Sequence, residues 1–299
     1  MGKKLLLFTA LFCMIWCMFP TTLRADGPTG KTYVALGDSI STGAGLANID
    51  QSFVSQVAAQ NGYDLTNLAQ DGETTASLVG KMSDPAVVTA ITSADVITIS
   101  IGGNDMMNVV YDFVAQQYNK ANPGANVDGN YIKTELQNKN MALFTFTISV
   151  LSNLDVSVFS DKLTELSGNF MKILASIRIV NAKAEIIILN QYNPYRFAAQ
   201  GIPNMEAIVE VFENGISMLN AGLVMIGKQY QCVEADVHGA FASATQNPCN
   251  ASFISMNLDF HPNAFGHGLI AEEVNSVLGG TTVPSYDLLE TLSEKWNSQ

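Results

Sequence analysis

A serine at position 39 stands where the chain could present a nucleophile. Residues 33–36 form an apolar run of strand-forming residues that ends abruptly in Gly37-Asp38-Ser39, and a glycine-containing segment follows. A hydroxyl in such a turn lies at the carboxyl end of a buried strand and near a helix N-terminus. Open α/β sheets bind ligands at that edge, and backbone N–H groups stabilise negative charge there. The sequence therefore predicts that Ser39 is a nucleophile.

A serine nucleophile needs a base within hydrogen-bond reach, and the chain contains three histidines. His261 is the best placed, because Pro262 stiffens the turn and a helical pattern begins at once, which favours the neutral imidazole at a helix N-terminus. His238 follows a predicted strand and is the alternative base. His267 falls inside a predicted helix, where it would serve packing or lie on the helix surface.

Acyl transfer also needs hydrogen-bond donors aimed at the oxyanion. The backbone N–H groups of Ser39 and Gly72 and the side-chain amide of Asn104 follow the ends of three predicted strands. In a parallel sheet these three donors would share one edge. Each has a simpler interpretation, since Gly72 could only close a turn and Asn104 could only cap the next helix.

These residues fall in four ordered blocks: residues 37–39 (GDS), 67–72 (NLAQDG), 102–105 (GGND) and 261–263 (HPN). The blocks resemble those of the SGNH (GDSL) hydrolases, a family that includes secreted esterases and lipases, and the resemblance spans residues 33 to about 274. It implies a flavodoxin-like sheet flanked by helices, Ser39 as nucleophile and His261 as base. It also implies an oxyanion hole formed by Ser39, Gly72 and Asn104.

One position departs from the family pattern. The family usually has an acidic residue three positions before the histidine, where this chain has Leu258, and Asp259 stands two positions before it instead. Either a shifted loop lets Asp259 orient the imidazole, or a backbone carbonyl near Leu258 does so and Asp259 caps the turn. We expect Asp259 to be the third member of the catalytic group.

The elements that must position these residues alternate along the chain. Five short predicted strands alternate with helical patterns, and the first three each end in a glycine-bearing turn with polar residues. This layout predicts an α/β fold, a three-layer α/β/α sandwich around a five-stranded, mainly parallel sheet. A single domain is expected over residues 26–280, with a helical insertion around 106–180 and a tail at 281–299. The predicted strands are residues 32–36, 64–68, 94–101, 184–189 and 231–235.

Within the predicted insertion, residues 141–159 are unusually apolar but interrupted by polar residues, including Asn153 and Asp155. That interruption argues against a membrane span. A helix packed into the core is the first interpretation, and a lid or acyl-binding cap over the site is the second.

The pattern of residues 1–25, with Lys3 and Lys4 before an apolar run, is typical of a secretory signal peptide. Cleavage would remove three basic residues and no acidic ones, so the net charge of −12 would become −15. We therefore expect a secreted protein without a stable membrane span, and nucleic acid is not an expected partner because phosphate binding needs clustered cations. In an exported protein Cys232 and Cys249 would form a disulfide, with two free thiols as the alternative.

Two other functions fit parts of the pattern. A metal-dependent phosphoesterase could assemble oxygen and nitrogen ligands from Asp38, Asn104, Asp105, Asp236, His238 and His261. A secreted carbohydrate-binding module could keep the fold without turnover. The leading prediction is a cofactor-free serine esterase or lipase acting on a small-molecule, lipid or acylated-carbohydrate ester.

Overall fold

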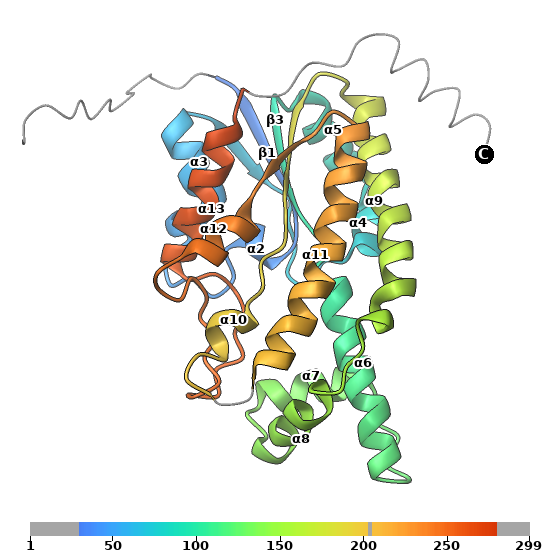
Figure 1. Ribbon diagram of the computed structural model, residues 1–299. Helices are drawn as coiled ribbons and strands as arrows, with labels where there is room; N and C mark the ends of the chain where they lie inside the picture. The colour runs from blue at the N-terminus through green and yellow to red at the C-terminus, as the bar shows by residue number, and fades with distance from the viewer. Residues whose placement is uncertain (1–29, 203–204, 280–299) are drawn as a thin grey trace, which may run out of the picture.

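The computed structural model describes residues 30–202 and 205–279. Its centre is a five-stranded, all-parallel sheet with the strand order β2-β1-β3-β4-β5 (Figure 1). This order is that of flavodoxin-like sheets, which confirms the predicted fold class. The strands are β1 (Thr32–Gly37), β2 (Asp64–Asn67), β3 (Val96–Ser100), β4 (Glu185–Leu189) and β5 (Val233–Ala235).

Helices cover both faces of the sheet and so complete the three layers (Figure 1). One face carries α3 (Phe53–Asn61), α12 (Val237–Ser243) and α13 (Ala264–Val277). The other carries α4 (Thr75–Lys81), α5 (Pro85–Ser93), α9 (Ser160–Val180) and α11 (Glu206–Gln229). The short elements α2 (Ser39–Thr42), η1 (Ile49–Gln51) and α10 (Tyr195–Ala198) lie in the connections.

Extra helices between β3 and β4 extend beyond the carboxyl edge of the sheet, at the bottom of Figure 1. They are α6 (Gly103–Ala121), α7 (Gly129–Gln137) and α8 (Met141–Leu151), followed by η2 (Val156–Phe159). Leu143 and Leu151 of α8 are buried, and the helix packs against α6 and α7. One face of α8 therefore packs against the core, while Met141 is exposed, and the function of the segment as a cap stays a prediction.

The predicted disulfide is not formed, because both cysteines are free. Cys232 packs into the core on the α9 and α11 side of the sheet, whereas Cys249 is buried in the core beside α3 and α13. The sheet separates the two sulfur atoms, so the pairing inferred from their number was wrong. Burial raises the pKa of both thiols above the usual range, that of Cys232 to about 12.

The N-terminal 25 residues and the tail at 281–299 lie outside the described residues, so the signal peptide and the tail stay predictions. By length and composition alone, α11 could cross a membrane. In the structure, however, its apolar face packs against α9 and the sheet, with Leu219 and Leu223 almost fully buried. The core therefore accounts for part of its apolar character, while Met218 and Met225 on the same helix are exposed.

His267 lies on α13 and is fully buried, so it serves packing and not the helix surface. Its Nδ1 accepts a hydrogen bond from the Phe53 N–H at 3.2 Å, and the two rings stack with centroids 6.2 Å apart. Burial, with a smaller contribution from the charge of His261, lowers the pKa of His267 to about 4. The imidazole is therefore neutral in the folded protein at neutral pH.

In acid, the free energy of unfolding of His267→Asn should fall less than that of the wild type. The folded protein binds fewer protons at this site than the unfolded chain, whose histidine titrates near 6.5. The stabilising contribution is therefore complete above pH 6.5 and is lost as the pH falls toward 4. Between pH 7 and pH 4.5 the wild-type free energy of unfolding should drop by about 2 to 3 kcal/mol more than that of His267→Asn, measured by urea unfolding. Parallel pH dependences of the two proteins would contradict this.

Candidate active site

Ser39 is presented by a tight junction between β1 and α2. Gly37 has φ 120°, and a Cβ there would lie 1.9 Å from the Ser100 carbonyl oxygen, so the approach of β1 to β3 requires glycine. Asp38 then caps α2 by accepting a hydrogen bond from the Ile40 N–H at 3.1 Å. As the first residue of α2, Ser39 has no acceptor within the helix for its own N–H, which leaves that N–H available to a ligand.

The carboxyl group of Asp38 is buried beside the serine and has no salt-bridge partner within the described residues. Burial raises its pKa to about 7, although hydrogen bonds from the Ile40 N–H and the Ser100 hydroxyl and the charge of His261 favour the ionised form. Ser100 Oγ also contacts Ser41 Oγ at 2.8 Å. Asp38 thus ties the start of α2 to the end of β3.

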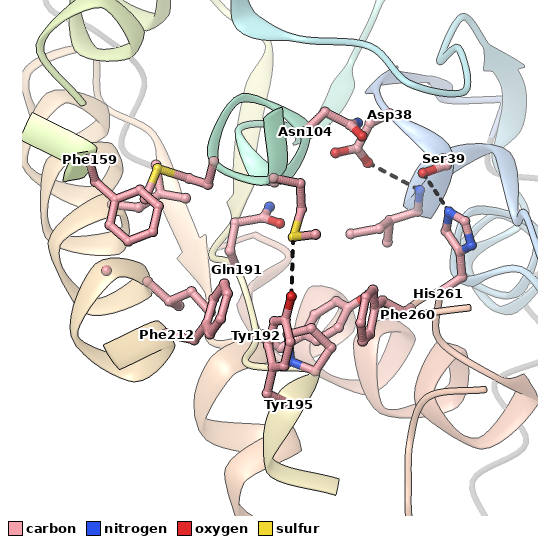
Figure 2. A pocket seen from close by; sticks show the side chains of 18 residues that line it. Asp38, Ser39, Asn104, Phe159, Gln191, Tyr192, Tyr195, Phe212, Phe260 and His261 are labelled. Carbon is pink, nitrogen blue, oxygen red and sulfur yellow. Dashed lines mark hydrogen bonds between the residues drawn. The ribbon is translucent and has the colours of Figure 1, made fainter. Parts of the chain in front are cut away.

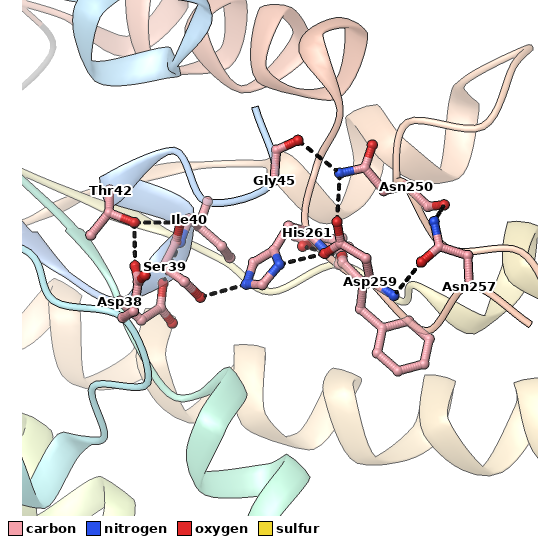
Figure 3. A network of polar contacts seen from close by, with 12 residues as sticks. Asp38, Ser39, Ile40, Thr42, Gly45, Asn250, Asn257, Asp259 and His261 are labelled. Carbon is pink, nitrogen blue, oxygen red and sulfur yellow. Dashed lines mark hydrogen bonds and ion pairs between the residues drawn. The ribbon is translucent and has the colours of Figure 1, made fainter. Parts of the chain in front are cut away.

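His261 reaches Ser39 from the loop before α13. Its Nε2 lies 2.9 Å from Ser39 Oγ, although the two residues are 222 positions apart (Figure 3). Backbone contacts on both sides fix the loop: the Asn250 N–H donates to the His261 carbonyl oxygen, and the Tyr192 hydroxyl donates to the Phe260 carbonyl oxygen, both at 2.9 Å. The predicted nucleophile and base are therefore in contact.

Asp259 lies on the other side of the imidazole. Its Oδ1 is 2.5 Å from His261 Nδ1, and its Oδ2 accepts a hydrogen bond from the Asn250 side-chain amide at 2.9 Å (Figure 3). Burial alone would raise the pKa of Asp259, but the hydrogen bonds and charge of His261 hold it below its usual value. An ionised carboxylate in this position keeps the proton on Nδ1 and leaves Nε2 free to accept one.

Leu258, which occupies the family's usual acid position, has a different environment. It packs against the hydrophobic core and lines the cleft near Ser39. The side chain two positions before the histidine, not three, therefore reaches the imidazole in this chain.

Gly72 and Asn104 lie at the same rim as Ser39. Gly72 has φ 76° in a turn closed by a hydrogen bond from the Glu73 N–H to the Gln70 carbonyl oxygen. The Asn104 amide nitrogen donates to the Glu73 carbonyl oxygen at 3.0 Å, which fixes its orientation and leaves its second N–H free for another acceptor. Both residues line one cleft with Ser39 and His261.

The other sequence candidates have structural partners of their own. His238 Nε2 contacts Glu213 Oε1 at 2.6 Å, so the alternative base does not lie with Ser39. Asp105 accepts hydrogen bonds from Thr75, and Asp236 caps α12. Within the described residues, no three His, Cys, Asp or Glu side chains are grouped to hold a metal ion. The proposed ligand set is therefore not assembled.

A cavity and a cleft reach the serine, and a second cavity shares lining residues with the cleft. The first cavity, about 130 Å³, has Ser39 and His261 at one end and the rings of Phe159 and Phe212 at the other (Figure 2). Its far walls are apolar. The cleft, about 280 Å³, runs from Ser39 past Gly72 and Asn104 to α7. A second cavity, about 60 Å³, lies among α6, α7 and α8.

Sequence reasoning missed the residues that support Asp259. Asn250 holds Asp259 Oδ2, and the Asn257 side chain holds the loop by accepting from the Asp259 N–H and donating to the Asn250 carbonyl oxygen. No spacing rule marks these asparagines, because their roles depend on how the loop before α13 folds back on itself.

A family model described as the GDSL-like Lipase/Acylhydrolase family matches residues 35–269. Among known proteins, YpmR of Bacillus subtilis strain 168 is 24% identical over 257 residues, covering 84% of this chain and 82% of YpmR. The spore germination lipase LipC of Bacillus licheniformis is 21% identical over 254 residues, covering 82% of this chain and 94% of LipC.

Among solved structures, phospholipase A1 from Streptomyces albidoflavus NA297 superposes with a TM-score of 0.57 at 19% identity, covering 83% of this chain and 99% of that one. At this identity the likeness concerns the fold, and it agrees with the sheet order and helical layers described above.

Proposed function

The chain belongs to the GDSL-like lipase/acylhydrolase family, and on that premise we propose that it is a serine esterase that cleaves carboxylic esters through an acyl-enzyme on Ser39. The observation that carries the proposal is the continuous contact from Ser39 Oγ to His261 Nε2 and from His261 Nδ1 to Asp259. The first contact joins the nucleophile to its base, and the second joins the base to the carboxylate that orients it, as acyl transfer requires.

In the proposed reaction Ser39 Oγ attacks the ester carbonyl while His261 Nε2 accepts the hydroxyl proton. Asp259 stabilises the imidazolium that results. Collapse of the tetrahedral intermediate transfers that proton to the departing alcohol and leaves the acyl group on Ser39. A water molecule then gives a proton to His261 and its hydroxide to the acyl carbon. As the second tetrahedral intermediate collapses, His261 returns that proton to Ser39 Oγ, and the carboxylic acid leaves the free serine.

We assign the oxyanion hole to the N–H groups of Ser39 and Gly72 and the side-chain amide of Asn104. The assignment is supported by their common cleft and by the hydrogen bond that fixes the Asn104 amide. Preorganised donors of this kind stabilise the charge that develops on the carbonyl oxygen without reorienting during the reaction.

Asn104→Ala should lower kcat by about 100-fold to 1000-fold, because one oxyanion donor is lost. The change is measured with p-nitrophenyl butyrate, alongside the melting temperature, since the same amide also holds the Glu73 carbonyl. Asn214→Ala, on an exposed position of α11, is the control that removes an asparagine amide elsewhere. An unchanged kcat in a folded Asn104→Ala protein would remove this residue from the oxyanion hole.

Two measurements test the proposed function as a whole. A fluorophosphonate probe should form a covalent bond to Ser39 Oγ with loss of fluoride, and mass spectrometry should locate the label on that residue. Hydrolysis of a p-nitrophenyl ester should persist after dialysis against a chelator. Activity that is lost when the chelator removes metal and returns when metal is added would support the phosphoesterase alternative. A protein that is neither labelled nor active would support the binding module.

The proposal includes export from the cell. It rests on the basic and apolar pattern of residues 1–25 and on the small residue Ala25 before Asp26. N-terminal sequencing of protein collected from the culture medium of an expressing bacterium should give Asp26 as the first residue. A protein retained in the cell with Met1 intact would contradict it.

A further inference from the structure

The first cavity has one polar corner, formed by Asp38 and Gln191. Both side chains line the cavity, whereas its far end is formed by apolar residues such as Phe159 and Phe212 (Figure 2). Asp38 is 2% exposed and Gln191 is 5% exposed. The proposed reaction gives Gln191 no task and uses Asp38 only as the cap of α2. Buried polar groups are unfavourable unless they are hydrogen-bonded, so the corner calls for a polar partner.

Each of the two side chains has an oxygen that is left unpaired. Asp38 Oδ1 accepts hydrogen bonds from the Ile40 N–H and the Ser100 hydroxyl, but Oδ2 has no partner among the described residues. Gln191 Nε2 donates to the Ile101 carbonyl oxygen at 3.4 Å, and Oε1 has no partner in the same part of the chain. Neither oxygen is among the unpaired side-chain atoms that are fully enclosed there. Their accessible surface therefore faces the cavity that both residues line.

Gly103, the first residue of α6, brings these two oxygens close to one point. A Cβ on Gly103 would lie 2.9 Å from Gln191 Oε1 and 4.0 Å from Asp38 Oδ2. One small polar group between the two oxygens can therefore contact both of them. Gly103 also lines the first cavity, so the absence of a side chain leaves this point open to it.

Gln191 is held in place by Asn220 of α11. The Gln191 N–H donates to Asn220 Oδ1 at 2.7 Å, and Asn220 Nδ2 donates to the Gln191 carbonyl oxygen at 2.8 Å. Both hydrogen bonds are buried, and Gln191 follows the end of β4. The corner is therefore preformed by β1, β4 and α6, and a ligand would not have to order it.

The surroundings of the corner favour a neutral group over a cation. The α6 helix begins at Gly103 and has no side-chain cap, so its first N–H groups leave a partial positive charge at this end. Burial raises the pKa of Asp38 to about 7, so at neutral pH its carboxyl exists with and without a proton. A hydroxyl suits both forms, because it can donate to the ionised oxygen or accept from the protonated one and donate to Gln191 Oε1.

We propose that this corner binds a hydroxyl group on the acyl part of the substrate, and that the protein is selective for esters of 3-hydroxy acids. The inference rests on the proposed esterase function. Asp38 directly precedes Ser39, and consecutive Cα atoms are about 3.8 Å apart, so the corner lies a few bonds from an acyl carbon at Ser39. The hydroxyl on the third acyl carbon lies between Asp38 Oδ2 and Gln191 Oε1, and the rest of the chain contacts the apolar walls.

The test uses three p-nitrophenyl esters of nearly the same shape at pH 7: the 3-hydroxybutyrate, the 3-methylbutyrate and the 3-aminobutyrate, whose amine is protonated. Each kcat/KM is divided by the rate constant for hydrolysis by hydroxide, which removes differences in intrinsic reactivity. For the wild type the corrected value should be about tenfold higher for the hydroxy ester than for the methyl ester. The ammonium ester should be cleaved more slowly than the hydroxy ester.

Gln191→Met tests whether the corner is the cause of this preference. Methionine keeps the length of the side chain and removes its oxygen, so the preference for the hydroxy ester over the methyl ester should fall about fivefold. A purely structural Gln191 would change both rates equally and leave the ratio unaltered. Gln229→Met, on an exposed position at the end of α11, is the matched control and should leave both rates at the wild-type level.

A wild type that cleaves p-nitrophenyl butyrate but shows no preference for the hydroxy ester would overturn the proposal, and so would a Gln191→Met protein that keeps the wild-type ratio. Faster cleavage of the ammonium ester than of the hydroxy ester would overturn it in favour of a cation site. A wild type that cleaves none of these esters, p-nitrophenyl butyrate included, would instead remove the proposed function. The failure of the inference and that of the function are therefore distinguishable.

Discussion

Replacing Ser39 by alanine is expected to lower kcat/KM for p-nitrophenyl butyrate by about 10⁴-fold or more. The substitution removes the atom that forms the acyl-enzyme, while the oxyanion donors and the cavities remain and can still support a slow attack by water. Within residues 30–202 and 205–279, the one hydrogen-bond partner of Ser39 Oγ is His261 Nε2. Its removal should therefore cost activity and leave stability close to that of the wild type.

Stability and activity must be measured together for this variant. Thermal unfolding should give a melting temperature within a few degrees of the wild-type value, since a single partly exposed hydrogen bond is lost. Ser276→Ala, on an exposed position of α13, is the matched control and should keep full activity. A Ser39→Ala protein that is folded and retains a tenth or more of the wild-type rate would show that another group is the nucleophile.

The sequence was sufficient to predict the sheet and the rim where the site lies. β1 and β3 are short apolar runs and β2 is a short, mostly polar strand, and each of the three is followed by a turn with glycine or polar residues. A parallel sheet brings such ends to one edge whatever lies between them. Ser39, Gly72 and Asn104 follow β1, β2 and β3 respectively, and the three strands are neighbours in the sheet. Their meeting at one cleft follows from topology and needs no knowledge of side-chain packing.

Features that depend on tertiary packing could not be predicted. Two cysteines in an exported chain suggest a disulfide, but their number does not reveal that Cys232 and Cys249 lie on opposite faces of the sheet. The helical period of residues 141–159 is visible, but the cavity that α8 forms with α6 and α7 depends on side chains from three helices and a distant loop. The sequence also left open whether Asp259 or a backbone carbonyl holds His261.

That last question leads to the second large expected effect. Asp259→Ala should lower kcat by about 10³-fold to 10⁴-fold while KM changes little, because the carboxylate stabilises the imidazolium as the proton moves and lines neither the first cavity nor the cleft. It also fixes the Nδ1 proton, and without it Nε2 spends part of the time protonated and unable to act as a base. Steady-state kinetics on p-nitrophenyl butyrate separates kcat from KM.

Asn250→Ala distinguishes a catalytic carboxylate from a turn cap. It leaves Asp259 in place but removes the hydrogen bond to Oδ2, so the carboxylate can rotate away from His261. If the carboxylate orients His261, Asn250→Ala should lower kcat about tenfold. The substitution should have no further effect on kcat when Asp259 is already alanine, so the double variant should be no slower than Asp259→Ala alone. A cap that only shapes the loop predicts losses in the melting temperature that add in the double variant, with kcat near the wild-type level in each folded protein. Near-normal turnover of Asp259→Ala would leave a serine–histidine pair held by the backbone of the loop before α13.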